Sequence, residues 1–114
     1  MVPTSHYFTS EPLDPAATRQ IDVTLAGRPV RVTTASGVFS PGRIDLGTSV
    51  LLRTLARHGD ASGLPPSGTF VDLGCGWGPL ALTMAALAPA ARVIAVDVNQ
   101  AARELTALNA RRMG

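Results

Sequence analysis

Near the middle of the chain stands the sequence Asp72-Leu73-Gly74-Cys75-Gly76-Trp77-Gly78. It overlaps the end of a short apolar run, Thr69 to Leu73, and precedes Pro79 to Leu87, where apolar residues have helical spacing. Pro79 suits the first position of a helix, where its missing N–H group is not needed. The order predicts a strand that turns through a glycine-rich loop into a helix.

A second unit of the same kind follows. Arg92 to Val96 is a run with β-branched residues that meets Asp97, and Gln100 to Arg112 is a second helical pattern closed by Gly114. Strands that alternate with helices at this spacing imply a parallel sheet with right-handed crossovers. The second half of the chain is therefore expected to form two βα units.

The first part of the chain predicts a hairpin. Residues 1–17 are rich in Pro, Ser and Thr and are interpreted as an extended lead-in. Apolar and polar residues then alternate from Ile21 to Leu25 and again from Val30 to Val32. Because Ala26-Gly27-Arg28-Pro29 supplies turn residues between them, the two stretches indicate a β-hairpin.

The region between hairpin and first strand predicts a loop, a helix and a linker. Residues 37–47 hold three glycines and a proline, with Phe39, Ile44 and Leu46 as buried anchors. Residues 48–58 have apolar side chains at helical spacing and predict an amphipathic helix. Residues 59–68 contain Pro65-Pro66 and are interpreted as a linker.

The glycine-rich loop has the features of a cofactor site. Glycines at positions 74, 76 and 78 remove Cβ atoms that would hold a ligand away from the backbone. The helix that follows begins with unpaired N–H groups and a partial positive charge, which suit an anionic group. Asp97 can accept hydrogen bonds from both hydroxyls of a ribose, and Val98 can face an adenine. The pattern indicates an adenosine-bearing cofactor.

Dinucleotide enzymes also combine a glycine-rich turn with an acid about 20 residues on. Their G-x-G-x-x-G pattern, begun at Gly74, requires glycine where this chain has Pro79. Begun at Gly76, it meets Ala81, a weaker substitute. Since neither register fits cleanly, a nicotinamide-dependent oxidoreductase is kept as an alternative.

The pattern D-x-G-x-G-x-G at residues 72–78, with Asp97 after the second strand, resembles motif I and its follower in class I S-adenosylmethionine-dependent methyltransferases. A second resemblance narrows the family to the small-domain methyltransferases of the ribosomal RNA guanine-N2 type. It is carried by Gly37-Val38-Phe39-Ser40, Ile44-Asp45-Leu46-Gly47-Thr48, Leu51-Leu52, His6-Tyr7-Phe8 and Leu108-Asn109-Ala110. The resemblance extends from His6 to Gly114.

This resemblance implies an α/β fold of the Rossmann-like methyltransferase type, with parallel strands and flanking helices after a β-hairpin and a helix. The expected parts are a lead-in at 1–17, the hairpin, loop and helix at 18–58, and the first two βα units of a truncated cofactor-binding domain at 69–114. It implies S-adenosyl-L-methionine as cofactor, methyl transfer to an exocyclic nitrogen of guanine in ribosomal RNA, and an RNA substrate for the complete protein.

The family's catalytic loop, Asn-Pro-Pro followed by an aromatic residue, comes after the fourth strand and lies beyond this sequence. The catalytic residues are therefore unknown, and the chain alone is expected to be inactive. A protein or small-molecule acceptor, or a binding module without catalysis, stays open as an alternative.

The expected cofactor contacts come from two sources. Residues and motif give Gly74, Cys75, Gly76, Gly78, Asp97 and Val98, while the resemblance alone adds Asp72, Phe39, Ser40, Asp45 and Thr48. For Asp72 the resemblance implies a place near the cofactor's amino group, and the alternative is a hydrogen bond to a backbone amide in the loop. Asp97 could also, or instead, cap the following helix. Trp77 is expected to pack the loop against the sheet, with covering the cofactor as the alternative, and Cys75 is expected to be a small loop residue.

Composition bounds these expectations. The 114 residues suffice for at most one domain, and 46% hydrophobic with 4% aromatic residues predicts an aliphatic core. The net charge of +2 comes from scattered arginines without any lysine, which a compositional bias explains better than nucleic-acid binding. One cysteine excludes an intramolecular disulfide, and no metal site is expected. Without a secretory signal or an apolar span, a cytoplasmic location is expected.

Overall fold

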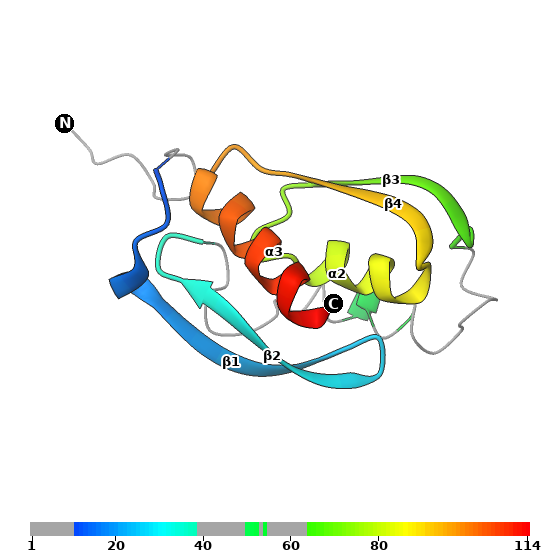
Figure 1. The fold of residues 1–114 in the computed structure, drawn as a ribbon, viewed down its shortest axis with the longest axis horizontal. Helices are drawn as coiled ribbons and strands as arrows, with labels where there is room; N and C mark the ends of the chain where they lie inside the picture. Colours follow the sequence, from blue (N-terminus) through cyan, green and yellow to red (C-terminus); the bar gives the residue numbers. More distant parts are fainter. Residues whose placement is uncertain (1–10, 39–49, 53, 55–63) are drawn as a thin grey trace.

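The computed structural model describes residues 11–38, 50–52, 54 and 64–114. In chain order its elements are the 3-10 helix η1 (Pro15–Ala17), the strands β1 (Thr18–Leu25), β2 (Arg28–Ala35) and β3 (Ser67–Leu73), the helix α2 (Pro79–Leu87), the strand β4 (Ala90–Val96) and the helix α3 (Gln100–Met113). Figure 1 shows both helices lying between the β3–β4 pair and the β1–β2 hairpin. The expected α/β fold, a hairpin followed by parallel strands with helices, is confirmed.

The hairpin has a tighter turn than the sequence predicted. Ala26 and Gly27 have φ values of 52° and 75°, as a two-residue type I′ turn requires. Arg28 and Pro29, which were expected in the turn, belong to β2 and lie opposite Leu25 and Thr24. The expectation of an extended lead-in up to residue 17 is also wrong at its end, because Asp14 caps η1 by accepting a hydrogen bond from the Ala16 amide at 2.9 Å.

The strands β3 and β4 pair in parallel, with Ser67 opposite Ala90 and Leu73 opposite Val96. Both begin two residues earlier than predicted, so Ser67 and Gly68 belong to the sheet and not to the linker. The sequence did not predict these first residues as strand because Ser67, Gly68, Ala90 and Ala91 are small or polar and show no alternation of large apolar and polar side chains. They belong to the strands because they pair with each other. Helix α2 has the predicted bounds, and Pro79 is its first residue.

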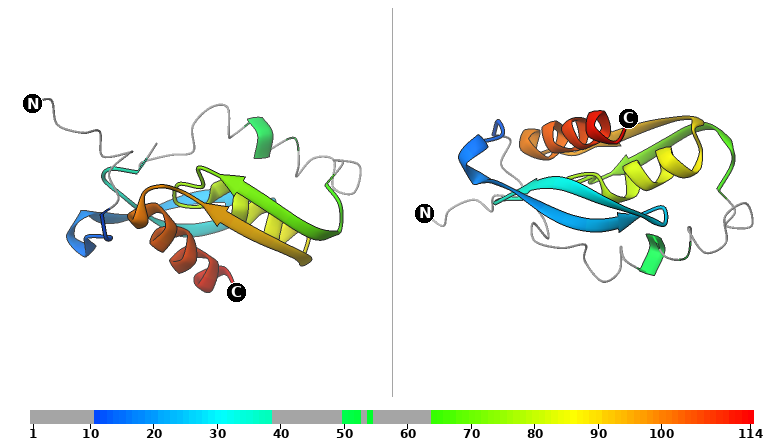
Figure 2. Two further views of the ribbon diagram at one scale, coloured as in Figure 1. Left: turned by 90° about the horizontal axis from the view of Figure 1, so that it is seen from above. Right: turned by 60° about the horizontal axis from the view of Figure 1, so that its bottom comes forward.

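The hydrophobic core lies between the hairpin and the two helices. It contains Leu25, Val32, Ala35, Val38, Leu52, Trp77, Leu82, Ala102 and Leu105. The opposite face of the β3–β4 pair is open and carries exposed Val71, Leu73, Ile94 and Val96. Figure 2 shows this pair as a two-stranded layer with its helices on one side. Among the described residues β3 pairs only with β4.

The region between hairpin and β3 is described only in part. Residues 50–52 and Thr54 are helical, as the pattern over 48–58 predicted, and Leu52 is buried in the core. The loop predicted over 37–47 lies outside the described residues beyond Val38. None of the helices in the described part of the chain is long and apolar enough to cross a membrane.

Thr34 offers a test of this core. Its side chain is fully buried, and its hydroxyl has no hydrogen-bond partner within the described ranges. A buried hydroxyl without a partner costs about 1 to 3 kcal/mol. Thr34→Val should therefore raise the free energy of unfolding by about 1 kcal/mol and increase the Tm, measured by circular dichroism.

The neighbouring Thr33 supplies the control, because its hydroxyl accepts a hydrogen bond from Arg112 at 3.0 Å. Thr33→Val should leave the Tm unchanged or lower it. A Thr34→Val variant no more stable than the unaltered chain would contradict the packing described for β2.

Candidate functional site

The parallel register brings the glycine-rich loop to the end of β4. The Gly74 and Cys75 amides both donate to the Val96 carbonyl, at 2.7 and 3.0 Å. One residue further on, the Gly76 amide donates to Oδ2 of Asp97 at 3.0 Å. The first loop and the acid that follows the second strand therefore form one continuous edge.

Asp97 keeps capacity for further hydrogen bonds. Its second oxygen, Oδ1, accepts from the Asn99 amide at 2.9 Å, so each carboxylate oxygen has one backbone donor. A carboxylate offers about four acceptor positions, which leaves two for other donors. Asp97 is partly exposed and Val98 beside it is 66% exposed. This arrangement can accept two neighbouring hydroxyl groups next to an apolar surface.

Asp97 is not the cap of the helix that follows it. That position belongs to Asn99, whose side chain accepts from the Ala101 amide at 2.9 Å. Asp97 lies two residues before Asn99, and by accepting from the Asn99 amide it stabilises the turn that leads into the helix. The alternative that Asp97 caps α3 directly is thus wrong, because Asn99 is better placed for the first turn.

The three glycines of the loop have different surroundings. Among the residues that the structure describes, a Cβ added at Gly74 would meet nothing within 4 Å, and at Gly76 it would meet Val38 Cγ1 at 3.9 Å. Both have positive φ, at 74° and 59°. At Gly78 an added Cβ would lie 3.1 Å from the Thr106 side chain. Gly74 and Gly76 therefore leave room beside the backbone, whereas Gly78 is required for packing α2 against α3.

Asp72 lies behind the loop and faces α2. It is buried, and its Oδ2 accepts from the amide of Ala81, the third residue of α2, at 3.1 Å. Burial raises the pKa of the Asp72 carboxyl, the hydrogen bond from Ala81 opposes that rise, and the charge of Asp97 adds to it. The hydrogen bond that was considered for Asp72 had a backbone amide of the loop as donor; the donor is instead an amide of α2, and the bond ties the end of β3 to the start of that helix.

The side chains of Cys75 and Trp77 point into the protein. Trp77 is 1% exposed and belongs to the core, which confirms its expected packing role. Cys75 is buried, and its Sγ lies 3.5 Å from the Thr106 hydroxyl. Burial raises the pKa of the Cys75 thiol, so the thiol stays protonated at neutral pH. Only the backbone of Cys75 can meet a ligand at the loop edge.

Sequence reasoning assigned no role at the loop to two residues, Thr106 and Asn109, although Asn109 belongs to a segment that carries the family resemblance. Thr106 donates to the Gly76 carbonyl at 2.9 Å, and Asn109 donates to the Trp77 carbonyl at 3.0 Å. Both are buried on the face of α3 that also carries Ala102 and Leu105. Polar residues at three- and four-residue spacing within an apolar stripe were the available signal.

Four predicted contacts cannot be placed. Phe39, Ser40, Asp45 and Thr48 lie outside the described residues. Within the described ranges, no three His, Cys, Asp or Glu side chains come together in a way that could hold a metal ion. Of the other predicted residues, Gly74, Gly76, Asp97 and Val98 lie at one edge with the backbone of Cys75, whereas Asp72 lies behind the loop and Gly78 packs against α3.

Relatives with this sequence pattern are known. Ribosomal RNA small subunit methyltransferase C of Pseudomonas putida is 39% identical over 90 residues, which cover 79% of this chain and 25% of that protein. The protein of the same name from Pseudomonas entomophila is 38% identical over 98 residues, covering 86% of this chain and 27% of that protein. The chain thus spans about a quarter of the length of these curated relatives.

A solved structure shares the fold. It is the T. thermophilus 16S rRNA N2 G1207 methyltransferase (RsmC) in complex with AdoMet and guanosine. The two structures align with a TM-score of 0.68 and 25% sequence identity, over 87% of this chain and 26% of that one. The fold of this chain is therefore similar to part of that protein.

The family match covers most of the sequence. The methyltransferase small domain family matches residues 29–114, from the second hairpin strand to the end of α3. That range contains the loop, Asp97 and the α3 residues that hold the loop. This chain therefore belongs to the methyltransferase small domain family.

Proposed function

We propose that this chain binds S-adenosylmethionine at the shared end of β3 and β4, as the cofactor side of a methyltransferase that modifies the exocyclic N2 nitrogen of a guanine in ribosomal RNA. Family membership supports methyl transfer. The names of the relatives support ribosomal RNA as substrate, and the solved neighbour contains both AdoMet and guanosine.

One observation carries the cofactor assignment. The Gly76 amide and the Asp97 carboxylate are hydrogen-bonded at 3.0 Å, while Cβ atoms added at Gly74 and Gly76 would meet almost nothing in the described part of the chain. A ligand can thus approach the bare backbone and reach Asp97 at the same time. The two acceptor positions left on Asp97 match the two hydroxyls of a ribose, and exposed Val98 matches an adenine face. The residues fit an adenosyl group.

The sulfonium of S-adenosylmethionine makes its methyl group electrophilic, so the protein has mainly to hold donor and acceptor in line. In this proposal Asp97 orients the ribose and the backbone at Gly74 to Gly76 lies along the cofactor. Asp72 supplies negative charge behind the loop, toward the cofactor's cationic amino group. Phe39, Ser40, Asp45 and Thr48 stay predicted contacts at the methionine end.

The methyl acceptor and the cellular location are inferred from the relatives. The chain covers about a quarter of the length of the two methyltransferases named above, and a guanine in ribosomal RNA, which follows from their names, competes with a protein or small-molecule acceptor. An enzyme of ribosomal RNA processing in bacteria would act in the cytoplasm. The nicotinamide-dependent alternative is set aside by membership in a methyltransferase family.

Replacing Asp97 tests the cofactor assignment. Asp97→Ala removes both acceptors offered to the ribose, and hydrogen bonds to a charged group contribute about 1.5 to 3 kcal/mol each. The affinity for S-adenosylhomocysteine, measured by calorimetric titration of the 114-residue chain, should fall at least about tenfold. Asp22→Ala, at an exposed acid of β1, should leave the affinity unchanged. Equal affinities of the Asp97→Ala and unaltered chains would exclude the ribose assignment.

Replacing Asp72 tests whether burying its carboxylate destabilises the folded chain at neutral pH. Since burial raises the pKa of this carboxyl in the folded chain, its contribution to stability is complete below the unfolded pKa and is lost as the pH rises through the folded pKa. Asp72→Asn keeps an acceptor for the Ala81 amide without the charge. Its Tm should exceed that of the unaltered chain at pH 7, and the difference should shrink toward pH 4.

The matched control is Asp22, a carboxyl whose pKa is shifted in the opposite direction. Arg31 lowers the pKa of Asp22 through a hydrogen bond and its charge, so Asp22→Asn should not raise the Tm at pH 7. If Asp72→Asn were less stable than the unaltered chain at neutral pH, the charged form of Asp72 would be the stabilising one.

A further inference from the structure

Helix α3 contacts the glycine-rich loop at two successive carbonyl groups. The Thr106 hydroxyl donates to the Gly76 carbonyl at 2.9 Å, and the Asn109 amide donates to the Trp77 carbonyl at 3.0 Å. The two side chains are three residues apart on one face of the helix, and both are buried. The loop is thus held from behind by side chains, in addition to its own backbone bonds.

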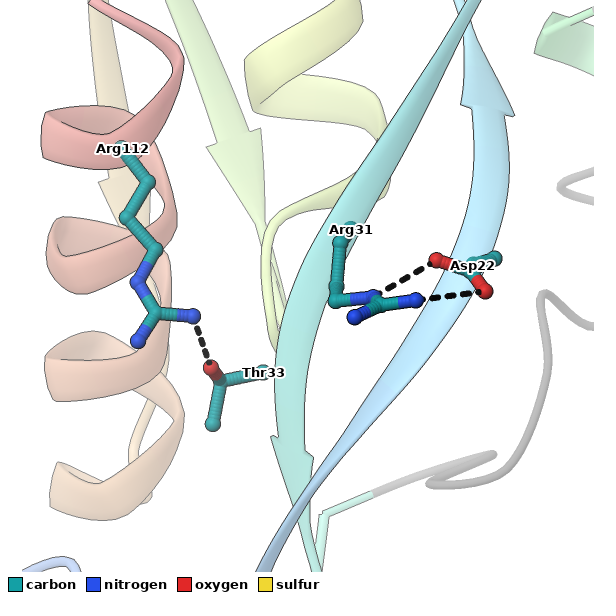
Figure 3. A network of polar contacts seen from close by, with 4 residues as sticks. All are labelled: Asp22, Arg31, Thr33 and Arg112. Carbon is teal, nitrogen blue, oxygen red and sulfur yellow. Dashed lines mark hydrogen bonds and ion pairs between the residues drawn. The ribbon is translucent and has the colours of Figure 1, made fainter.

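Asn109 also holds the hairpin. Its Oδ1 accepts from the Thr33 amide at 2.8 Å, and its Nδ2 donates to the Thr33 carbonyl at 3.0 Å. The two hydrogens of Nδ2 are therefore divided between Thr33 and Trp77. Figure 3 shows Arg112, nearly one turn further along α3, reaching the Thr33 hydroxyl. The Asn109 side chain therefore connects Thr33 of β2 to the Trp77 carbonyl of the loop.

These contacts fix the orientation of the loop peptides. In a trans peptide the carbonyl and the following N–H point in opposite directions. Holding the Gly76 carbonyl on α3 turns the Trp77 amide away from α3. The same restraint keeps Gly76 in place, whose own amide donates to Asp97. The position of the acid relative to the loop thus depends on α3 as well as on strand pairing.

We propose that Thr106 and Asn109 are positioning residues of the cofactor site, which hold the glycine-rich loop in its binding conformation before the ligand arrives. The expected effect of these two residues on ligand affinity rests on the proposed cofactor site. Asn109 additionally couples the loop to the hairpin through Thr33. A loop ordered in advance loses less conformational entropy on binding, so affinity depends on side chains that never touch the ligand.

The variant Thr106→Val tests the proposal, because valine has the shape of threonine but cannot donate to the Gly76 carbonyl. The matched control is Thr83→Val. Thr83 is fully buried, and its hydroxyl donates to the Pro79 carbonyl within α2 at 2.7 Å, without any bond to the loop. Each variant loses a hydrogen bond from a buried hydroxyl to a backbone carbonyl, and Thr106→Val also loses the weak contact of that hydroxyl with Cys75 Sγ at 3.5 Å. A general loss of stability should therefore affect the two variants similarly.

Two properties of the 114-residue chain are measured for each variant. Amide hydrogen exchange at residues 74–78 should become about fivefold faster in Thr106→Val than in Thr83→Val, the factor for one lost hydrogen bond. The affinity for S-adenosylhomocysteine, measured by calorimetry, should fall by about the same factor. Asn109→Asp keeps the acceptor for the Thr33 amide but removes both donors, and should speed exchange at the loop and at β2 together.

The outcomes separate this inference from the proposed function. If the unaltered chain binds the cofactor and Thr106→Val binds it equally well, the positioning role is overturned. Unchanged loop exchange in Thr106→Val overturns it as well, whether or not Asn109→Asp folds. A third outcome is that the unaltered chain does not bind the cofactor, while amide hydrogen exchange at residues 74–78 is faster in Thr106→Val as expected. In that case the cofactor assignment fails, and α3 restrains the loop for another reason.

Discussion

The hydrogen bond from the Gly76 amide to Asp97 joins the two βα units at the edge where a ligand can approach. It forms only because Leu73 and Val96 lie opposite each other in a parallel pair, which places the loop and the acid side by side. The surrounding contacts serve this arrangement. Asp72 ties β3 to the start of α2, Asn99 starts α3 next to Asp97, and α3 returns to hold the loop from behind.

Much of the fold was predictable from sequence because its signals are local. Glycines at alternate positions after an apolar run, followed by proline, define the passage from β3 to α2, whose bounds were predicted correctly. The strand starts were missed because Ser67, Gly68 and Ala90 carry no hydrophobic signal and join the sheet only through pairing. The same holds for Arg28 and Pro29, which become strand residues because the turn needs only Ala26 and Gly27.

The sequence predicted that the glycine-rich loop and Asp97 would lie together, as they do, but revealed less about what each residue does there. Alternate glycines suggested one common role, yet almost none of the described residues lies near Gly74 and Gly76, while Gly78 lies against Thr106. That distinction depends on a helix almost 30 residues further along the chain. Asn109 likewise contacts segments that are distant in sequence. Its spacing within the apolar stripe of α3 signals a buried polar residue, but not which segments it contacts. Membership in the methyltransferase small domain family explains why these segments occur together.

The central claim is that the ends of β3 and β4 form one adenosyl-binding edge. It is tested most directly by following the backbone amide signals of the isotope-labelled chain in NMR spectra while S-adenosylhomocysteine is added. The account predicts that the largest changes occur at Gly74 to Gly78 and at Asp97 to Asn99. Changes confined to the hairpin turn and the end of α3, with both of those segments unaffected, would contradict it.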